Sequence, residues 1–243
     1  GKSDFTRPKL ENWRLCFASD APLRLKVMRY HAQRMVLLQL SVQQGWSTDH
    51  GRDSEAARAA AATAREINPA CSIALTMDGL VHGTLLKDRE RASALYDEAV
   101  SLNPNSALAC LLKGTQYAFV DDGPSAVTWT RRARRLSPLD PQRYLFEALS
   151  SAACLADGDY ESALAFADSS LRINRRHTSS LRARIVALQL LGRGDEARET
   201  TGDLMRREPD LTIERYLRTH PAADFETGRM WARALSEAGV PQR

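Results

Sequence analysis

A segment of similar composition recurs five times along the chain, and its nearly constant spacing restricts the fold more than any other feature. Each copy begins at an alanine, and four of the five copies end at a proline. The copies run over residues 57–69, 92–104, 126–138, 163–175 and 197–209. Successive copies begin 35, 34, 37 and 34 residues apart. A sustained period near 34 residues indicates an array of helical hairpins.

Such an array forms because one hairpin cannot bury its own apolar side. Two short antiparallel helices leave an apolar face exposed, and the stacking of successive hairpins buries these faces in one continuous core. Alanine permits close approach of the helices, while proline ends a helix because it lacks an N–H donor. With 43% hydrophobic residues, the 243-residue chain is long enough for a sizeable core. We therefore expect an all-α fold without a β-sheet.

Small and aromatic residues at fixed positions make the pattern more specific. The best-matching repeat contains Gly114, Tyr117, Ala126, Ala133 and Pro138. The two repeats before it contain Gly79, Ala92, Tyr96, Ala99 and Pro104, and Gly45, Ala57, Ala64 and Pro69. This spacing resembles the tetratricopeptide repeat (TPR) over roughly residues 38–209. The resemblance implies a right-handed superhelical TPR solenoid of about five repeats with a C-terminal capping helix. The later repeats depart from it at Ser151, Arg175 and Ile185.

The chain is expected to divide into an N-terminal arm or linker (1–20), the repeat array (21–209) and C-terminal capping helices (210–243). Within the first two parts, apolar residues at helical spacing predict a helix over 20–44. In the last part, helices are expected over 212–219 and 224–238, with Asp224 as the N-cap of the second. The abrupt polar start of the chain suggests that a longer protein continues upstream.

No constellation of residues predicts catalysis. The five histidines are scattered, and the chain contains no HExxH, GxSxG or Walker motif. The four cysteines form no CxxC pair, so they are expected to be small buried hydrophobic residues without a metal. The aspartates at 121–122 and 157–159, and the glycines at 192–194, are expected in turns between helices. We therefore expect no enzymatic activity, no metal and no cofactor.

The TPR resemblance implies that the first helix of each repeat lines a concave groove. The predicted groove positions are mostly apolar, which disfavours the Lys, Asn and Arg clamp that binds a C-terminal carboxylate in some family members. They are Ile73, Thr76, Leu80, Leu108, Leu111, Thr115, Leu145, Ala148, Ala152, Ser179, Arg182 and Val186. One interpretation is a groove for an apolar peptide, a hydrophobic helix or a lipid-like small molecule, with Arg182 as its polar end. The other is packing between neighbouring helices, or against the N-terminal arm.

A run of arginines is the strongest charge feature of a chain whose net charge is only +4. This basic patch consists of Arg131, Arg132, Arg134 and Arg135, near the end of a second helix on the expected convex side. Further arginines follow at 172, 175, 176, 182 and 184. The patch is open to three interpretations: a solvated helix end that favours cations, a dock for an acidic partner, or a nucleic-acid contact. Interleaved aromatic residues for base stacking are missing from the patch, which disfavours the third.

Two short motifs bear on the biological context. Residues 136–141 (LSPLDP) and 238–241 (AGVP) resemble the C-terminal repeat regions of bacterial multidomain signalling proteins. In those proteins a winged-helix DNA-binding domain or a class III nucleotide cyclase domain precedes the repeats. The resemblance implies a cytoplasmic regulatory half of a transcriptional regulator, which would meet DNA only through an upstream domain. Homodimerisation is also open.

The alternatives are a stand-alone scaffold that binds protein or peptide partners, or the regulatory region of a cyclase. A membrane partner is not expected, because no apolar run approaches the roughly 20 residues that span a bilayer.

Overall fold

The computed structural model describes residues 50–243, and every regular element in this part of the chain is a helix. The helices are α3 (His50–Ile67), α4 (Ser72–Thr84), α5 (Arg89–Leu102), α6 (Ala107–Phe119), α7 (Gly123–Leu136), α8 (Arg143–Asp157), α9 (Tyr160–Ile173), α10 (Thr178–Leu190), α11 (Gly194–Arg207), α12 (Ile213–Thr219) and α13 (Glu226–Glu237). The predicted all-α class is confirmed. The helix expected over 20–44, and the arm before it, lie outside the described residues.

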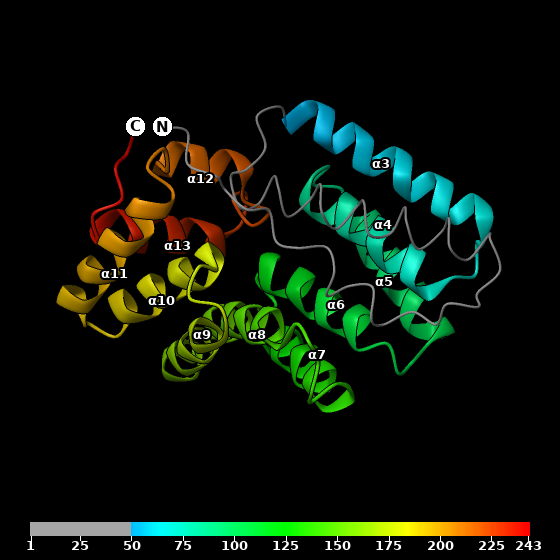
Figure 1. The fold of residues 1–243 in the computed structure, drawn as a ribbon, viewed down its shortest axis with the longest axis horizontal. Coiled ribbons are helices and arrows are strands. Elements are labelled where there is room, and N and C mark those ends of the chain that lie inside the picture. The colour runs from blue at the N-terminus through cyan, green and yellow to red at the C-terminus, as the bar shows by residue number, and fades with distance from the viewer. Residues whose placement is uncertain (1–49) are drawn as a thin grey trace.

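Four helical hairpins stack side by side into a curved array, which Figure 1 shows from α4 to α11. The hairpins are α4–α5, α6–α7, α8–α9 and α10–α11, and α3 packs against the first of them. Neighbouring first helices also contact one another, from α4 to α6, α8 and α10. The array is the solenoid that the 34-residue period predicts.

Close helix approach explains the glycines of the repeat. A Cβ atom on Gly114 would lie 2.9 Å from the backbone nitrogen of Thr130 and 3.0 Å from the carbonyl oxygen of Ala126. One repeat later Ser151 takes this position, and its hydroxyl donates a 2.7 Å hydrogen bond to the carbonyl of Ala163. Ile185 is fully buried at the next equivalent position. Two of the departures from the family pattern, Ser151 and Ile185, are therefore buried in their helices as Gly114 is.

Three of the second helices, α5, α7 and α9, begin at aspartates, and those of α7 and α9 were expected in turns. The carboxylates of Asp88, Asp122 and Asp159 accept hydrogen bonds from backbone N–H groups at 3.1, 3.1 and 3.0 Å in the first turns of α5, α7 and α9. Each satisfies an N–H group that a helix leaves without an intrahelical partner. Gly158 and Gly192 lie in the turns after α8 and α10, so their expected turn role is confirmed.

The apolar core continues from the array into the C-terminal helices. Its largest cluster joins α8–α13 and also includes Phe119 at the end of α6. Cys110 and Cys154 are buried within the repeats, as predicted for small hydrophobic residues, and Cys71 is half-buried. Cys16 lies outside the described residues. Among the helices of residues 50–243, none combines the length and the apolar character required to cross a bilayer.

Candidate interaction surfaces

The predicted groove positions divide into two groups. Ile73 is 44% exposed on α4, whereas the other apolar positions are half-buried or buried. The half-buried residues are Leu80, Leu108, Leu145 and Ala152, and the buried ones are Thr76, Leu111, Thr115, Ala148 and Val186. Side chains available to a partner are therefore concentrated at Ile73 and the half-buried leucines of α4, α6 and α8.

The C-terminal segment (residues 211–243) folds back against the first helices. Helix α13 contacts both α10 and α6, and Val186 belongs to the same apolar cluster as Trp231. The ring of Phe119 at the end of α6 meets the Trp231 ring edge-on, with 6.4 Å between centroids. In Figure 1, α12 and α13 lie beside α10 at one end of the arch. This part of the first-helix face is thus occupied by the chain itself.

Asp121 holds the start of α13 from more than 100 positions earlier in the chain. Its two carboxylate oxygens accept hydrogen bonds from the backbone N–H groups of Glu226 (3.1 Å) and Thr227 (2.8 Å). Burial alone would raise the pKa of Asp121, but the hydrogen bonds from Thr227 and Glu226 outweigh it and hold the pKa below its usual value. The residue had been expected only in a turn.

The predicted N-cap of the last helix is wrong. The N-cap residue of α13 is Phe225, whose side chain makes no capping hydrogen bond. Asp224 instead points to a different partner, because its carboxylate accepts a 3.1 Å hydrogen bond from Arg89. The capping acceptor for α13 is therefore Asp121, which is distant in sequence, and not a residue next to the helix.

Arg89 is the second long-range tie to this segment. Its guanidinium donates a 2.5 Å hydrogen bond to the carbonyl of Pro221 and lies 4.7 Å from the centre of the Phe225 ring. Because Arg89 starts α5, this contact joins the C-terminal segment to the α4–α5 hairpin. Arg89 and Asp121 together fasten the segment to two successive repeats, which the sequence did not indicate.

His220 packs among three aromatic rings at the centre of this contact. The Tyr216 ring stacks on it at 4.6 Å, and the Phe119 and Trp231 rings meet it edge-on at 5.3 and 5.5 Å. Its Nδ1 accepts a 3.1 Å hydrogen bond from the backbone N–H of Ala222. Burial lowers the pKa of His220 to about 3, with a further contribution from the positive charge of Arg182. The neutral imidazole is therefore part of the packing.

A second histidine lies in a chain of hydroxyl groups that resembles a catalytic pair. His177 Nδ1 is 2.7 Å from the Ser180 hydroxyl, and Ser180 is 2.7 Å from the Ser170 hydroxyl. Ser170 donates to the carbonyl of Tyr144, at 2.7 Å. A carbonyl only accepts, so Ser180 must donate to Ser170, and His177 must donate to Ser180. The imidazole cannot remove a proton that already points away from it, so the chain is structural.

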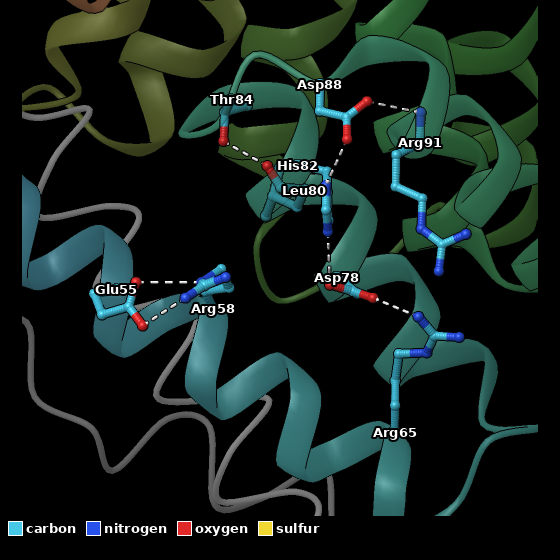
Figure 2. A network of polar contacts seen from close by, with 9 residues as sticks. All are labelled: Glu55, Arg58, Arg65, Asp78, Leu80, His82, Thr84, Asp88 and Arg91. Atoms are coloured by element: carbon cyan, nitrogen blue, oxygen red, sulfur yellow. Dashed lines mark hydrogen bonds and ion pairs between the residues drawn. The ribbon is translucent and has the colours of Figure 1, made fainter.

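A polar network in the first described repeats is also structural (Figure 2). The carboxylate of Asp78 accepts a 2.9 Å hydrogen bond from Arg65 and lies 3.6 Å from His82 Nε2, while His82 Nδ1 is 3.3 Å from Asp88. These contacts join α3, α4 and the start of α5. Within residues 50–243, no cluster of three or more His, Cys, Asp or Glu side chains is placed to hold a metal.

Arg182, the predicted polar end of the groove, is engaged in an internal contact. Its guanidinium donates a 2.6 Å hydrogen bond to Glu208 and a 3.1 Å hydrogen bond to the Ser179 hydroxyl. Arg182 and Glu208 are both largely buried at this ion pair. The charge of Arg182 is therefore already paired within the chain at this end of the groove.

The four arginines of the basic patch also differ in their contacts with the rest of the array. Arg131 and Arg135 are exposed, whereas Arg134 is half-buried with its guanidinium 4.2 Å from the centre of the Phe166 ring. Arg132 donates a 2.7 Å hydrogen bond to the carbonyl of Pro104 and lies 5.2 Å from the Trp129 ring centre. Helix α7 ends at Leu136, as expected. Arg134 thus packs within the array, Arg132 contacts it while remaining exposed, and Arg131 and Arg135 project from it.

Comparison with solved structures identifies helical-repeat proteins. The chain is similar to PilW, a type IV pilus biogenesis factor (17% identity, 86% of this chain and 90% of that chain, TM-score 0.60). It is also similar to PilF of Pseudomonas aeruginosa (19% identity, 87% and 90%, TM-score 0.58). A third similar structure is TTC0263, a thermophilic TPR protein of Thermus thermophilus (15% identity, 88% and 99%, TM-score 0.60).

No protein-family model and no characterised protein sequence matches the chain. At such low identity the structural likeness concerns the fold alone. Together with the helical hairpins and their glycine contacts, it shows that this chain folds as an all-α TPR solenoid.

Proposed function

We propose that this chain is a non-catalytic interaction domain that binds a protein or peptide partner along its first helices. The observation that carries the proposal is the incomplete covering of this face. The C-terminal segment packs on α10 and α6, while Ile73 remains 44% exposed and Leu80, Leu108 and Leu145 are half-buried. A row of partly accessible apolar side chains on a rigid helical surface suits the apolar side of a helix or extended peptide.

The close packing of the helices that form this face favours a preformed binding surface. Its helices are tied by buried contacts such as the Ser151–Ala163 hydrogen bond and the Gly114 approach to Thr130. A preformed surface lowers the entropy lost on binding. The histidine that resembles a base, His177, is committed as a donor to Ser180, so it supports no proton transfer. A hydrophobic small molecule is a lesser candidate ligand for the same apolar side chains.

The first experiment maps the partner by site-specific photo-crosslinking. A benzophenone amino acid replaces Ile73 or Leu145 on the first-helix face, and Glu199, exposed on α11, serves as the matched control position. We expect both face positions to capture the same protein and the control position to capture none. The purified partner should then form a stoichiometric complex that Ile73→Asp weakens at least about tenfold.

Other outcomes have distinct meanings. Crosslinks confined to the same chain would show that the face is fully self-occupied, and equal capture at Glu199 would show non-specific association; either result contradicts the proposal. Crosslinks between two copies of the chain would show that the partner is a second copy and not a different protein. Circular dichroism of each variant checks that the helices are intact.

A second candidate function places the chain in a cytoplasmic transcriptional regulator, as its sensory half, or in a nucleotide cyclase. The LSPLDP and AGVP motifs favour it; the first spans the last residue of α7 and the turn before α8, and the second directly follows α13. Sequencing the reading frame upstream of Gly1 tests it. A winged-helix or cyclase domain is expected there, and a stand-alone scaffold is favoured if neither is present.

A further inference from the structure

A second surface, on the opposite helices of the array, carries unbalanced positive charge. We define the α7–α9 arginine surface as Arg131 and Arg135 on α7, Arg172 on α9 and Arg175 in the turn after α9. All four side chains are exposed. Among the described residues, none of the four guanidinium groups has a carboxylate within ion-pair distance, although twelve ion pairs of Arg or Lys occur elsewhere in the same residues. The surface therefore has positive charge that no ion pair within residues 50–243 neutralises.

Two members of this surface, Arg172 and Arg175, also line a hollow of about 390 Å³ between α9 and α10. It is lined by Asp168, Leu171, Arg172, Arg175 and Arg184. Arg184 is already used, because it donates a 2.8 Å hydrogen bond to Asp168 and another to the Thr200 hydroxyl. The single carboxylate of the hollow is thereby occupied, and Arg172 and Arg175 remain available at its rim.

The equivalent positions one repeat earlier are neutralised within the chain. Lys113, which directly precedes Gly114, forms a 2.5 Å ion pair with Asp97 and lies 4.0 Å from the Trp129 ring centre. In the next repeat the residue before Ser151 is Ser150, and the position of Asp97 is taken by Arg131.

The acid Asp97 is thus replaced by the base Arg131. The cation that Asp97 pairs with, Lys113, is replaced by the buried Ser150. The Ser150 hydroxyl has no hydrogen-bond partner among the described residues. The internal pair seen on both sides, Lys113–Asp97 and Arg184–Asp168, is lost where the arginines gather.

Two of the most exposed apolar side chains lie at the same helix ends. Leu139, in the turn after α7, is 89% exposed, and Ile173, the last residue of α9, is 50% exposed. The Ser170 hydroxyl bonds to the carbonyl of Tyr144, which ties the end of α9 to the start of α8 just after the Leu139 turn. Single exposed leucines are ordinary, but here they border a positively charged surface.

We propose that the α7–α9 arginine surface binds an acidic segment of a partner protein. Glutamate or aspartate carboxylates of the segment pair with Arg131, Arg135, Arg172 and Arg175, and an apolar side chain packs on Ile173 and Leu139. Charge complementarity selects an acidic partner. Nucleic acid is disfavoured, because the nearby aromatic rings are covered: Lys113 and Arg132 flank Trp129, and Arg134 covers Phe166.

This inference rests on the proposed interaction function but concerns a different face, so the two can fail separately. The probe is a fluorescent peptide of glutamate and leucine, measured by anisotropy against the full chain. The test variant is Arg131→Ala/Arg172→Ala/Arg175→Ala. The control variant, Arg198→Ala/Arg229→Ala/Arg233→Ala, removes three exposed arginines from α11 and α13 and so gives the same net charge.

We expect the test variant to weaken peptide binding at least about tenfold and the control variant to change it less than about twofold. Ile173→Ser should weaken it further, whereas Ile73→Asp on the opposite face should leave it unchanged. Equal weakening by both triple variants would overturn the proposal. So would tighter binding of a single-stranded oligonucleotide of equal charge, or of phosphatidylserine vesicles, with the same dependence on Arg131, Arg172 and Arg175.

Discussion

The repeats of α4–α9 and the C-terminal segment are held in place by different kinds of contact. In the repeats, each tie is between a helix and its neighbour, as in the Gly114 approach to Thr130 and the Ser151 hydrogen bond to Ala163. In the C-terminal segment, the ties run to Arg89 and Asp121, more than 100 positions away. The first kind repeats with the sequence period, whereas the second occurs once and depends on the assembled array.

This difference teaches that the array and its C-terminal segment can be destabilised separately. Loss of a repeat contact should weaken the whole solenoid, because each hairpin supports its neighbours. Loss of a contact to the C-terminal segment should first release α12 and α13 and uncover part of the first-helix face. Amide hydrogen exchange, which resolves local from global opening, distinguishes the two responses.

The largest expected effect is at the C-terminal segment. Trp231→Ala removes a buried ring that packs against Phe119 and His220, and a truncation of this type costs about 3 to 5 kcal/mol. Hydrogen exchange should show faster exchange in α12 and α13 while α4–α7 keeps its protection. Uniform loss of protection along the chain would contradict the separation of the two regions.

The next effect is at the repeat contact. Gly114→Ala places a Cβ atom within 3.0 Å of backbone atoms of α7, which cannot yield as a flexible side chain would, so we expect a loss of about 1 to 3 kcal/mol. Gly202→Ala on α11 is the matched control, because its Cβ would meet only the end of the Arg206 side chain, at 3.7 Å. The control should gain about 0.5 to 1 kcal/mol. Denaturant unfolding measures both.

The pH dependence of stability should reveal the buried histidines. Burial lowers the pKa of His220 to about 3 and that of His177 to about 4, below the ordinary value of 6.5. The folded state therefore binds fewer protons than the unfolded state between these values, and stability falls as the pH drops below about 6.5. Each histidine should contribute on the order of 1 kcal/mol per pH unit.

His220→Phe tests which region responds to acid. Between pH 6.5 and 4, α12 and α13 of the variant should lose less protection from hydrogen exchange than in the original chain. The loss of protection that His177 causes in the α9–α10 turn should remain. If the pH profile of the variant matched that of the original chain, neutral His220 would not be part of the packing.

The smallest effect is at the helix cap. Asp121→Ala removes the acceptor for the Glu226 and Thr227 N–H groups and should cost about 1 kcal/mol, confined to the start of α13. Because the pKa of Asp121 lies below its usual value, this contribution is present above about pH 4 and is lost as the pH falls further. Asp195→Ala, on the exposed α11 surface, is the control and should change exchange at α13 little.

The repeat architecture could be predicted because its cause is local. Glycine, alanine and proline recur wherever two helices approach or a helix ends, so the period is visible in the sequence itself. The turn aspartates followed from the same pattern, whereas the burial of Cys110 and Cys154 was predicted from the absence of CxxC pairs. Of the predicted groove positions, Thr76, Leu111 and Val186 proved to be buried between elements of the array. Periodicity assigns a residue to a face, but it does not give the depth at which neighbours cover that face.

The long-range ties could not be predicted, because they join residues that no period relates. The sequence assigned the α13 cap to Asp224, the nearest suitable side chain, whereas Asp121 supplies it. A faint signal existed: Asp122 alone suffices to start α7, so the adjacent Asp121 was left without a local role. The charge imbalance at Arg131 could be recognised only by aligning the repeats and by observing the Lys113–Asp97 ion pair in the structure.

The return of the C-terminal segment has a mechanical consequence. An open solenoid behaves as a spring, since each unit touches only the next and small rotations add up along its length. Arg89 and Asp121 connect the C-terminal segment to two earlier repeats of the array. An extension of the array that moves the C-terminal segment away from these repeats would therefore have to break these hydrogen bonds.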